Sequence, residues 1–286
     1  MKLEFWKLHG CGNDYLFMDV RKPISADPDW PRLAQRLSDR RWGVGSDGLI
    51  TINAAPGHDA RMRIYNRDGS ESEMCGNGLR ALAKWLYDRG EAGREQSIVT
   101  GAGVLYPEVV ASVQGRAQQI RVNMGAPRFS GRAVGIASLQ GQSSESGQFA
   151  VDGENLTGHW VSMGNPHLVF FGELWNQQQM ERRGPNLEHH GWFRNRINVH
   201  SAEIVDRHRM RMRHWERGSG ITMACGTGAA GGGVLASRLR LLEMPVAVEV
   251  PGGELRVEWS GHDDDPTFLT GPAEEVFHGF VEWLPD

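Results

Sequence analysis

Two short motifs built around cysteine, 150 residues apart, constrain the architecture of this chain more than any other feature of its sequence. Their shared frame is a small or apolar residue, Cys, Gly, a polar residue and Gly. It occurs as Met74-Cys75-Gly76-Asn77-Gly78 and as Ala224-Cys225-Gly226-Thr227-Gly228. Each motif follows a polar, turn-rich run and leads into a stretch of helical periodicity. Because the separation is about one domain length, the sequence predicts two copies of one strand, loop and helix unit.

The spacing of apolar residues predicts a mixed α/β chain in which strands outnumber helices. Alternation at period two predicts half-buried strands over Leu3–Trp6, Arg61–Tyr65, Gln119–Asn123, His208–Trp215 and Ala247–Trp259. Apolar residues three and four apart predict helices over Trp30–Arg41, Gly78–Arg89 and Gly228–Arg240.

The composition is that of a globular chain without a polyanionic or membrane partner. Its 286 residues, of which 40% are hydrophobic and 23% charged, suffice for two domains that each bury a core. A formal net charge of −4 gives no broad basic field for nucleic acid. No apolar run approaches the length of a membrane span, and residues 1–20 are charged and glycine-rich where a signal peptide would be apolar. We therefore expect a cytoplasmic protein.

The three cysteines, Cys11, Cys75 and Cys225, are predicted to be free thiols. An odd number at such wide spacing is not a disulfide framework, and free thiols indicate a reducing compartment. Cys11 is also flanked by glycines, but its segment has no repeated counterpart. We interpret Cys11 as structural, and at most as a neighbour of the site.

The placement of a cysteine at a helix N-terminus suits proton transfer. Backbone N–H groups and the positive end of the helix dipole both favour the thiolate and lower the pKa of the thiol, which is ordinarily about 8.5. The same kind of N–H group, here expected from Gly76, Asn77, Gly226 and Thr227, can bind a carboxylate. Two such helix starts would hold one α-carboxylate while a thiolate removes the α-proton and the opposite thiol protonates the other face. The predicted chemistry is stereoinversion of an amino acid without a cofactor.

Three other hypotheses have weaker support. The chain has no CxxC or HExxH motif, and the adjacent His189 and His190 lack further ligands at a suggestive spacing, so no metal site is predicted. Segments 43–48 and 226–231 match GxGxxG, but neither lies in a convincing strand–helix–strand unit, which argues against an NAD(P)-dependent oxidoreductase. A non-catalytic amino-acid-binding protein would not need an acid/base group at both helix starts.

Further motifs give the chain a resemblance to the diaminopimelate epimerase family. Besides the two cysteine motifs, the first of which continues to Arg80, they are Lys7-x-x-Gly10-x-Gly12-Asn13-Asp14-Tyr15, Gly43-x-Gly45-x-Asp47-Gly48, Asn66-x-Asp68-Gly69-Ser70, Gly164-Asn165-Pro166-His167, Glu216-Arg217-Gly218 and Gly271-Pro272-Ala273. The motifs run in family order over nearly the whole chain. They distinguish it from the related proline racemases and phenazine-biosynthesis isomerase-like proteins.

The resemblance implies two pseudo-symmetric α/β domains, each a mixed, barrel-like sheet around a central helix, with the active site in the cleft between them. We expect residues 1–126 plus 272–286 to form the N-terminal domain, and residues 127–271 the C-terminal domain. The implied activity converts L,L-diaminopimelate to its meso form in lysine and peptidoglycan biosynthesis. The implied enzyme is a homodimeric isomerase that uses neither pyridoxal phosphate nor metal.

Site residues follow from the family motifs position by position. Cys75 and Cys225 match the two acid/base residues, and His167 and Glu216 match positions thought to tune the thiols. The positions that match substrate-binding residues are Asn13, Asn66, Asn165, Asn198 and Arg217, with Gly76, Asn77, Gly226 and Thr227 binding through backbone groups. A distal amino-acid group on the substrate explains why several amides and one guanidinium are required.

The chain departs from the family pattern at three places. Ile221 stands where many members have glutamate, and the run that begins at Arg194 lacks the proline often found before the arginine. His200 replaces a frequent acidic or amide residue. We interpret these changes as affecting recognition of the distal end of the substrate. A related cofactor-independent racemase acting on another amino acid, such as histidine, is therefore the main alternative enzyme.

Overall fold

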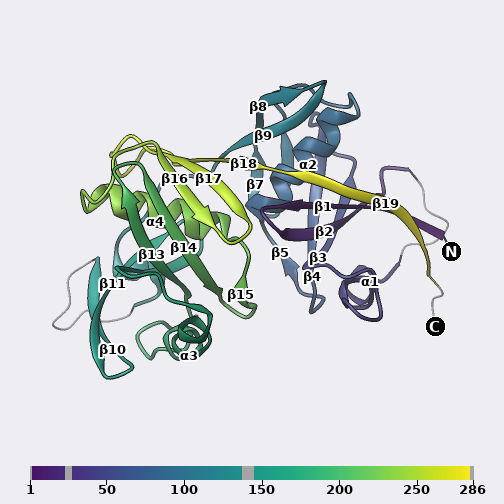
Figure 1. Ribbon diagram of the computed structural model, residues 1–286. Coiled ribbons are helices and arrows are strands. Elements are labelled where there is room, and N and C mark those ends of the chain that lie inside the picture. The colour runs from purple at the N-terminus through teal and green to yellow at the C-terminus, as the bar shows by residue number, and fades with distance from the viewer. Residues whose placement is uncertain (1, 23–27, 137–144, 284–286) are drawn as a thin grey trace. The chain divides into compact units, whose positions relative to one another are not determined.

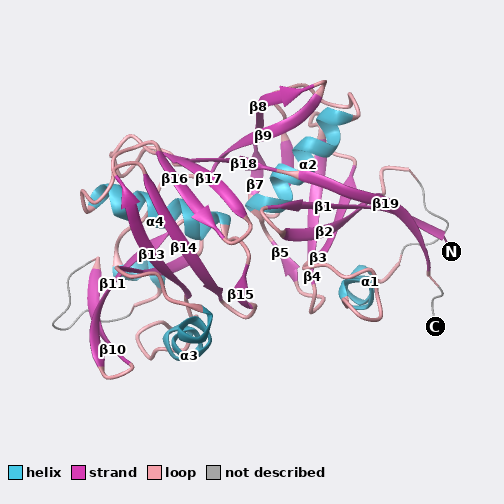
Figure 2. Cartoon of the chain, in the orientation of Figure 1, coloured by secondary structure: helices cyan, strands magenta, loops and turns pink. Residues whose placement is uncertain are grey.

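The computed structural model describes residues 2–22, 28–136 and 145–283 and contains two compact units. One unit comprises Met1–Val122 together with Gly271–Asp286, and the other comprises Asn123–Thr270. The chain thus enters the second unit once and returns to the first for its last strand. Strands dominate both units (Figure 2), which confirms the predicted mixed α/β class.

The first unit contains an open, mixed sheet. Its strand order is β19 (Glu274–Glu282), β1 (Lys2–Gly10), β2 (Asn13–Asp19), β3 (Gly48–Asn53), β4 (Ala60–Asn66), β6 (Ile98–Thr100) and β7 (Gly103–Leu105). The short strand β5 (Glu71–Ser72) pairs with β4, and β8 (Glu108–Val113) forms a hairpin with β9 (Arg116–Asn123). Helix α1 (Trp30–Ser38) follows β2, and helix α2 (Gly76–Asp88) follows β5.

The second unit is also built on an open sheet. Its strands run in the order β10 (Ser146–Val151), β11 (Glu154–Ser162), β12 (Pro166–Phe171), β13 (Asn198–Asp206), β14 (Arg209–Glu216), β16 (Val246–Val250), β17 (Gly253–Glu258) and β18 (Phe268–Pro272). The short strand β15 (Gly220–Thr222) pairs with β14. A 3-10 turn (Gly131–Val134) precedes the sheet, helix α3 (Gln177–Glu188) follows β12, and helix α4 (Gly226–Arg238) follows β15.

The two units repeat one order of strand pairings. The pairs β2–β3 and β12–β13 are parallel, β3–β4 and β13–β14 are antiparallel, and β4–β6 and β14–β16 are again parallel. One helix connects the first parallel pair in each unit and a second helix connects the last. The repeat predicted from two five-residue motifs therefore extends over a whole succession of strands and helices.

Helices α2 and α4 lie at the centre of their units (Figure 1). Helix α2 packs against β1, β2, β8 and β19 and is buried from Gly76 to Leu86. Helix α4 packs against β11 to β14, β16 and β17 and is buried from Gly228 to Ala236. At least three strands of the first sheet and six of the second pack on one helix, and each sheet curves around its helix. The sheets are thus barrel-like in curvature, but neither closes.

Two elements of the structure differ from the sequence prediction, for reasons visible in the local sequence. The predicted strand Ala247–Trp259 is two strands, β16 and β17, because Pro251 and Gly252 form a turn between them. Helix α3 was not indicated by apolar periodicity. Its start is fixed by a capping box, in which the side chains of Asn176 and Gln179 each accept a hydrogen bond from the backbone N–H of the other residue.

The helix predicted over Trp30–Arg41 ends earlier, at Ser38. Asp39 adopts an extended backbone, and its side chain accepts hydrogen bonds from the backbone N–H groups of Arg41 and Trp42. These hydrogen bonds stabilise a turn after Ser38, so the helix ends there and does not continue to Arg41.

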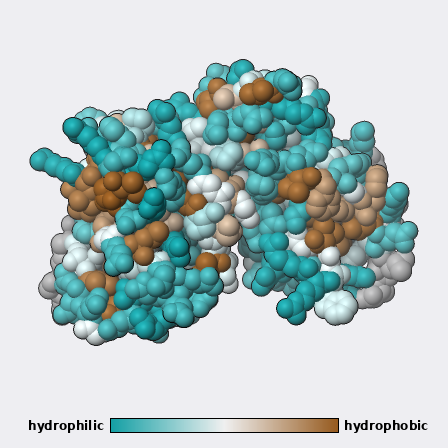
Figure 3. All heavy atoms as spheres, in the orientation of Figure 1, coloured by the Kyte–Doolittle hydropathy of each residue, from teal (hydrophilic) through white to brown (hydrophobic). Residues whose placement is uncertain are grey.

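The described surface carries separated apolar patches on a mostly hydrophilic face (Figure 3). Strand β19 is an edge strand that exposes apolar side chains at Val276, Phe277 and Phe280. None of the helices in the described part of the chain is both long and apolar enough to cross a membrane. The homodimer implied by the sequence stays a prediction.

A substitution at Gly184 would test how tightly α3 packs on the sheet of the second unit. A Cβ at this position would lie 2.4 Å from Cδ2 of Trp215, whose Nε1 donates to Glu188 Oε2 at 2.7 Å. Because that hydrogen bond holds the indole ring, the steric overlap outweighs the gain of about 1 kcal/mol that alanine brings to a helix interior. We expect Gly184→Ala to lower the free energy of unfolding by about 1–3 kcal/mol in a urea titration.

Gly191→Ala is the matched control, since no atom lies within 4 Å of the Cβ it would add. This variant should keep the wild-type unfolding midpoint. Equal midpoints for the two variants would contradict the packing of α3 described above.

Candidate active site

The first cysteine motif begins helix α2. Cys75 is the N-cap residue, with an extended backbone at φ −140°, and its Sγ accepts a hydrogen bond from the Gly78 N–H at 3.4 Å. The side chain is partly exposed, unlike the helix that follows it. The prediction that this motif opens a helix is confirmed, and it places the thiol next to the first-turn N–H groups.

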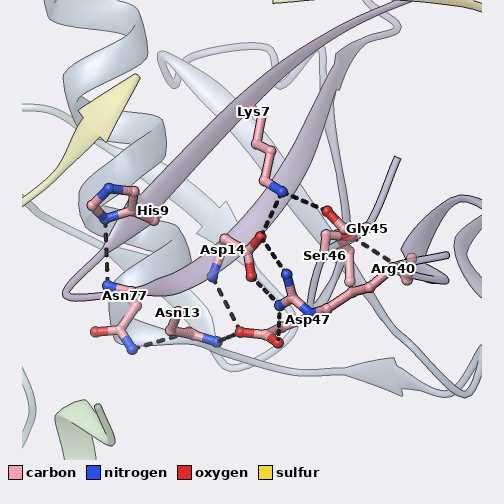
Figure 4. A network of polar contacts seen from close by, with 12 residues as sticks. Lys7, His9, Asn13, Asp14, Arg40, Gly45, Ser46, Asp47 and Asn77 are labelled. Carbon is pink, nitrogen blue, oxygen red and sulfur yellow. Dashed lines mark hydrogen bonds and ion pairs between the residues drawn. The ribbon is translucent and has the colours of Figure 1, made fainter. Parts of the chain in front are cut away.

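Two asparagines surround the Cys75 thiol. Cys75 Sγ lies 3.5 Å from Asn13 Oδ1, and the same oxygen accepts a hydrogen bond from Asn77 Nδ2 at 3.0 Å. Asn13 Nδ2 in turn donates to Asp47 Oδ2 at 2.7 Å (Figure 4). The Asn13 amide is therefore fixed with its oxygen towards the thiol.

An ion-pair network holds Asp47 in place behind Asn13 (Figure 4). Arg40 Nη2 donates to both Asp47 Oδ1, at 2.9 Å, and Asp14 Oδ1, at 2.6 Å. Lys7 Nζ lies 2.9 Å from Asp14 Oδ2. Burial alone would raise the pKa of Asp14, but hydrogen bonds from Arg40 and Lys7 lower it below its usual value. The network thus remains charged at neutral pH and keeps the asparagine oriented.

Arg80 is a fully buried cation one turn into α2. Its Nη2 donates to Asn77 Oδ1 at 2.7 Å, and its Nε lies 3.4 Å from the Pro272 carbonyl oxygen. Burial lowers the pKa of Arg80, and the nearby thiols of Cys11 and Cys75 oppose that shift. Arg80 therefore fixes the Asn77 amide, and Cys11, which is also buried, packs behind the site.

The second cysteine motif begins helix α4 in the same way, but in different surroundings. Cys225 is an extended N-cap residue at φ −120° and is only 3% exposed. Burial raises the pKa of its thiol well above the usual value, and the negative charge of Glu216 adds to the rise. The Thr227 hydroxyl, 3.6 Å from Sγ, acts in the opposite direction. At Cys225, burial thus outweighs the effect of the helix start, which by itself favours the thiolate.

Three buried histidines line the sheet beside Cys225. His167 on β12, His200 on β13 and His214 on β14 are each 0% exposed. His167 Nδ1 lies 2.9 Å from His200 Nε2, and His200 Nδ1 lies 2.9 Å from His214 Nδ1. Burial lowers the pKa of His167 and of His214 to about 3 and lowers that of His200 well below its usual value. All three rings are therefore neutral at neutral pH, and each hydrogen bond carries one proton.

The protons of this chain can be assigned from its outer end. His167 Nε2 lies 2.8 Å from Asn165 Oδ1, while Asn165 Nδ2 donates to Thr227 Oγ1 at 3.2 Å. With that amide orientation, His167 carries its proton on Nε2, so His200 donates through Nε2 and His214 donates through Nδ1. His214 Nε2 is then an unprotonated nitrogen, which agrees with its being buried without a hydrogen-bond partner. His200 thus belongs to the surroundings of the thiol, and its assignment to distal substrate recognition is wrong.

Two of the predicted substrate-binding residues in the second unit contact each other. Asn198 Oδ1 accepts the Arg217 N–H at 2.9 Å, and Asn198 Nδ2 donates to the Pro166 carbonyl oxygen at 2.9 Å. The guanidinium of Arg217 donates through Nη1 to the Asn195 carbonyl oxygen at 2.9 Å. Asn198 therefore ties the start of β12 to Arg217. In the first unit, Asn66 ends β4 and donates to Ser70 Oγ at 3.0 Å.

Several residues that shape the site were not identified from the sequence. Arg40 and His214 belong to no quoted motif, although His214 follows Met210 and Met212 at period two on a strand whose even positions are buried. That alternation was a usable signal for an inward-facing imidazole. No local pattern marks Arg40, which reaches Asp14 from the turn after α1.

Known proteins resemble this chain over nearly its whole length. The family model for diaminopimelate epimerase matches residues 5–130 and 159–276. The diaminopimelate epimerase of Moorella thermoacetica is 41% identical over 278 residues, which cover 97% of this chain and 98% of that protein. That of Desulfitobacterium hafniense is 41% identical over 282 residues, covering 98% of each.

Solved structures of more distant proteins share the fold. A phenazine biosynthesis protein of the PhzF family from Bacillus anthracis superposes with a TM-score of 0.71 at 19% identity, covering 99% of this chain and 100% of that one. A probable proline racemase from Agrobacterium radiobacter gives a TM-score of 0.66 at 13% identity, covering 99% and 93%. Since the family match and the 41% identity extend over nearly its whole length, this chain belongs to the diaminopimelate epimerase family.

Proposed function

We propose that this chain epimerises L,L-diaminopimelate to meso-diaminopimelate without a cofactor, with Cys75 and Cys225 as the two acid/base groups. The observation that carries the proposal is that each thiol caps a buried helix at equivalent positions of two repeated units. A two-base inversion needs this arrangement, because one group removes the α-proton from one face and the other delivers a proton to the opposite face. We place the reaction in the cytoplasm, in lysine and peptidoglycan precursor synthesis.

Each thiol has partners for both of its protonation states, as an acid/base group requires. The Cys75 thiolate accepts from the Gly78 N–H, and the Cys75 thiol has Asn13 Oδ1 as an acceptor. For Cys225, the Thr227 hydroxyl favours the thiolate, and Glu216 favours the thiol. A cysteine that served only as packing would need neither set of partners.

We assign opposite starting states to the two thiols. Burial and Glu216 hold Cys225 as the protonated thiol, so Cys225 begins a turnover as the proton donor. Cys75, less buried and next to a helix N–H, takes the role of base. After one turnover the α-proton resides on Cys75 and Cys225 is a thiolate, which is the state that catalyses the reverse reaction.

Arg217 is the proposed partner of the distal carboxylate of the substrate. Its backbone is tied to Asn198, and its guanidinium contacts the Asn195 carbonyl oxygen through one of several N–H groups. A planar guanidinium can present two parallel N–H groups to a carboxylate. The alternative substrate classes, such as histidine, lack that second carboxylate.

The direct test is to incubate the purified protein with L,L-diaminopimelate and resolve the stereoisomers. A parallel incubation in heavy water should introduce deuterium at the α-carbon, because every inversion exchanges that proton. A protein that binds the substrate but exchanges no α-proton would be a binding protein. Faster racemisation of histidine than of diaminopimelate would replace the proposed substrate.

Removing either catalytic thiol should abolish inversion while the fold is retained. We expect Cys75→Ala and Cys225→Ala each to lower kcat by about a hundredfold or more, since general acid–base catalysis contributes at least that much. Cys11→Ala is the matched control and should keep near wild-type turnover, with circular dichroism confirming the fold of all three. Near wild-type turnover in either of the first two variants contradicts the two-base pair.

The pH dependence of Cys225 reactivity should shift in opposite directions in two variants. Glu216→Gln removes the negative charge that raises the pKa of Cys225, so more thiolate forms at a given pH and alkylation by iodoacetamide moves to lower pH. Thr227→Val removes the hydroxyl that lowers this pKa and should move the profile to higher pH. The rates are measured on Cys225 by peptide mapping in a Cys75→Ser background. Shifts of the same sign would show that these two groups do not set the pKa.

Substitution of Arg217 should lower kcat/KM more for substrates that have a distal carboxylate than for those that lack one. Arg217→Lys keeps the charge but loses the fork geometry, and we expect kcat/KM for diaminopimelate to fall by about tenfold or more. Arg211→Lys on β14, which changes an exposed arginine paired with Glu249, is the control and should leave kcat/KM unchanged. An equal loss with an amino acid that has no distal carboxylate would assign Arg217 another partner.

A further inference from the structure

A sulfur atom and two imidazoles form a buried group of potential metal ligands at the start of α4. The ligand atoms of His167, His200 and Cys225 all lie within 4.8 Å of one another, and all three residues are buried. They come from β12, β13 and the N-cap of α4. Gly228 permits this approach, because a Cβ there would lie 2.5 Å from His200 Cε1 and 3.1 Å from Cys225 Sγ.

The hydrogen bonds around these rings resemble the outer shell of a metal site. Histidine ligands usually have their second ring nitrogen fixed by a neighbouring group. His167 Nε2 is held by Asn165 Oδ1, and His200 Nδ1 is held by His214 Nδ1. The remaining nitrogens, His167 Nδ1 and His200 Nε2, face each other at 2.9 Å. A cation between them would replace the hydrogen bond that they share. It would also require the His200 proton to move from Nε2 to Nδ1 and the His214 proton to move from Nδ1 to Nε2.

The distances require little movement to accommodate a tetrahedral ion. Around zinc, two nitrogen ligands lie about 3.3 Å apart, and a nitrogen and a sulfur lie about 3.6 Å apart. The nitrogens have to separate by about 0.4 Å, and the widest spacing in the group has to contract by about 1 Å. One thiolate with two imidazoles is a donor set that binds zinc, cadmium and cobalt(II) more strongly than magnesium or calcium. The negative charge of Glu216 beside the thiol further favours a cation.

We propose that Cys225 Sγ, His167 Nδ1 and His200 Nε2 bind a thiophilic divalent cation, with Zn²⁺ as the expected ion, and that this binding reversibly inhibits the enzyme. Binding releases the thiol proton of Cys225 to solvent. It leaves the imidazoles neutral, because the protons of His200 and His214 shift to the other nitrogen of each ring. The bound thiolate can no longer exchange a proton with a substrate. The inhibitory part of the inference rests on the proposed function of Cys225, whereas the binding part does not.

The test uses the full-length protein, freed of metal with a chelator and then dialysed. Cobalt(II) is added as the probe, since a thiolate ligand gives a charge-transfer band and tetrahedral geometry gives intense visible bands. Zinc affinity is measured by competition with a chromophoric chelator. The variants are Cys225→Ser and His200→Gln, which remove one ligand each, and Cys75→Ser and Cys11→Ser, which leave the proposed ligands intact.

We expect one equivalent of cobalt(II) to bind with a thiolate band, and zinc to displace it. Affinity should fall by about a hundredfold or more in Cys225→Ser and in His200→Gln, because each loses a ligand and not only an outer-shell partner. Cys75→Ser and Cys11→Ser should retain the wild-type spectrum. Thermal unfolding shows whether each variant is folded. If His200→Gln fails to fold, Cys225→Ser, which changes one atom, still tests the loss of a ligand.

Two outcomes overturn the inference. If Cys75→Ser loses the thiolate band while His200→Gln retains it, the ion is bound by the two thiols and not by the histidine group. If all four variants bind as the wild type does, the ion binds elsewhere. Epimerase activity without cobalt(II) binding would remove this inference and leave the proposed function standing, whereas binding without activity would do the reverse.

Discussion

Burial of two central helices determines where the chemistry of this chain lies. Helix α4 packs against six strands of its sheet and helix α2 against three of its own, and each helix begins at a cysteine with an extended backbone. Sliding either helix by one residue would rotate it by about 100° and turn a different set of side chains towards the sheet. The position of each thiol is therefore set by the packing of a whole helix. The two proposed acid/base groups are therefore held as firmly as the core, as the proposed proton transfer requires.

The repeat fixes the position of the cysteines but leaves their environments free to differ. Cys75 is partly exposed beside two asparagines, which a cluster of paired charges keeps oriented. Cys225 is buried beside three neutral imidazoles, and its burial together with the carboxylate of Glu216 raises the pKa of the thiol. A difference in environment between two titratable groups is the usual means of assigning acid and base roles at one pH. The two cysteines occupy equivalent positions because the unit is repeated, and their surroundings differ because the neighbouring strands carry different residues.

The sequence predicts those features that depend on short stretches of chain. The helix starts at Gly76 and Gly226 and the mixed α/β class follow from motifs and periodicity. The histidine chain does not, because His200 and His214 become neighbours only through the register of β13 with β14, and register is a property of the assembled sheet. The raised pKa of Cys225 is not predictable for the same reason: the helix start is local, but the burial that outweighs it comes from strands far away in sequence. Arg80 likewise has an ordinary place in a helical pattern, and only the surrounding sheet makes it a buried cation.

The departures from the family pattern acquire different meanings once their places are known. His200 is fully buried between two other imidazoles, so it acts on the surroundings of Cys225 and gives no argument for a different substrate. Ile221, on β15, and Arg194 are exposed and belong to segments that lead to Cys225 or to the tie between Asn198 and Arg217. A change in substrate preference requires a change on a surface that the substrate can reach. Of the three departures, only these two meet that condition, and neither replaces Arg217, the proposed partner of a second carboxylate.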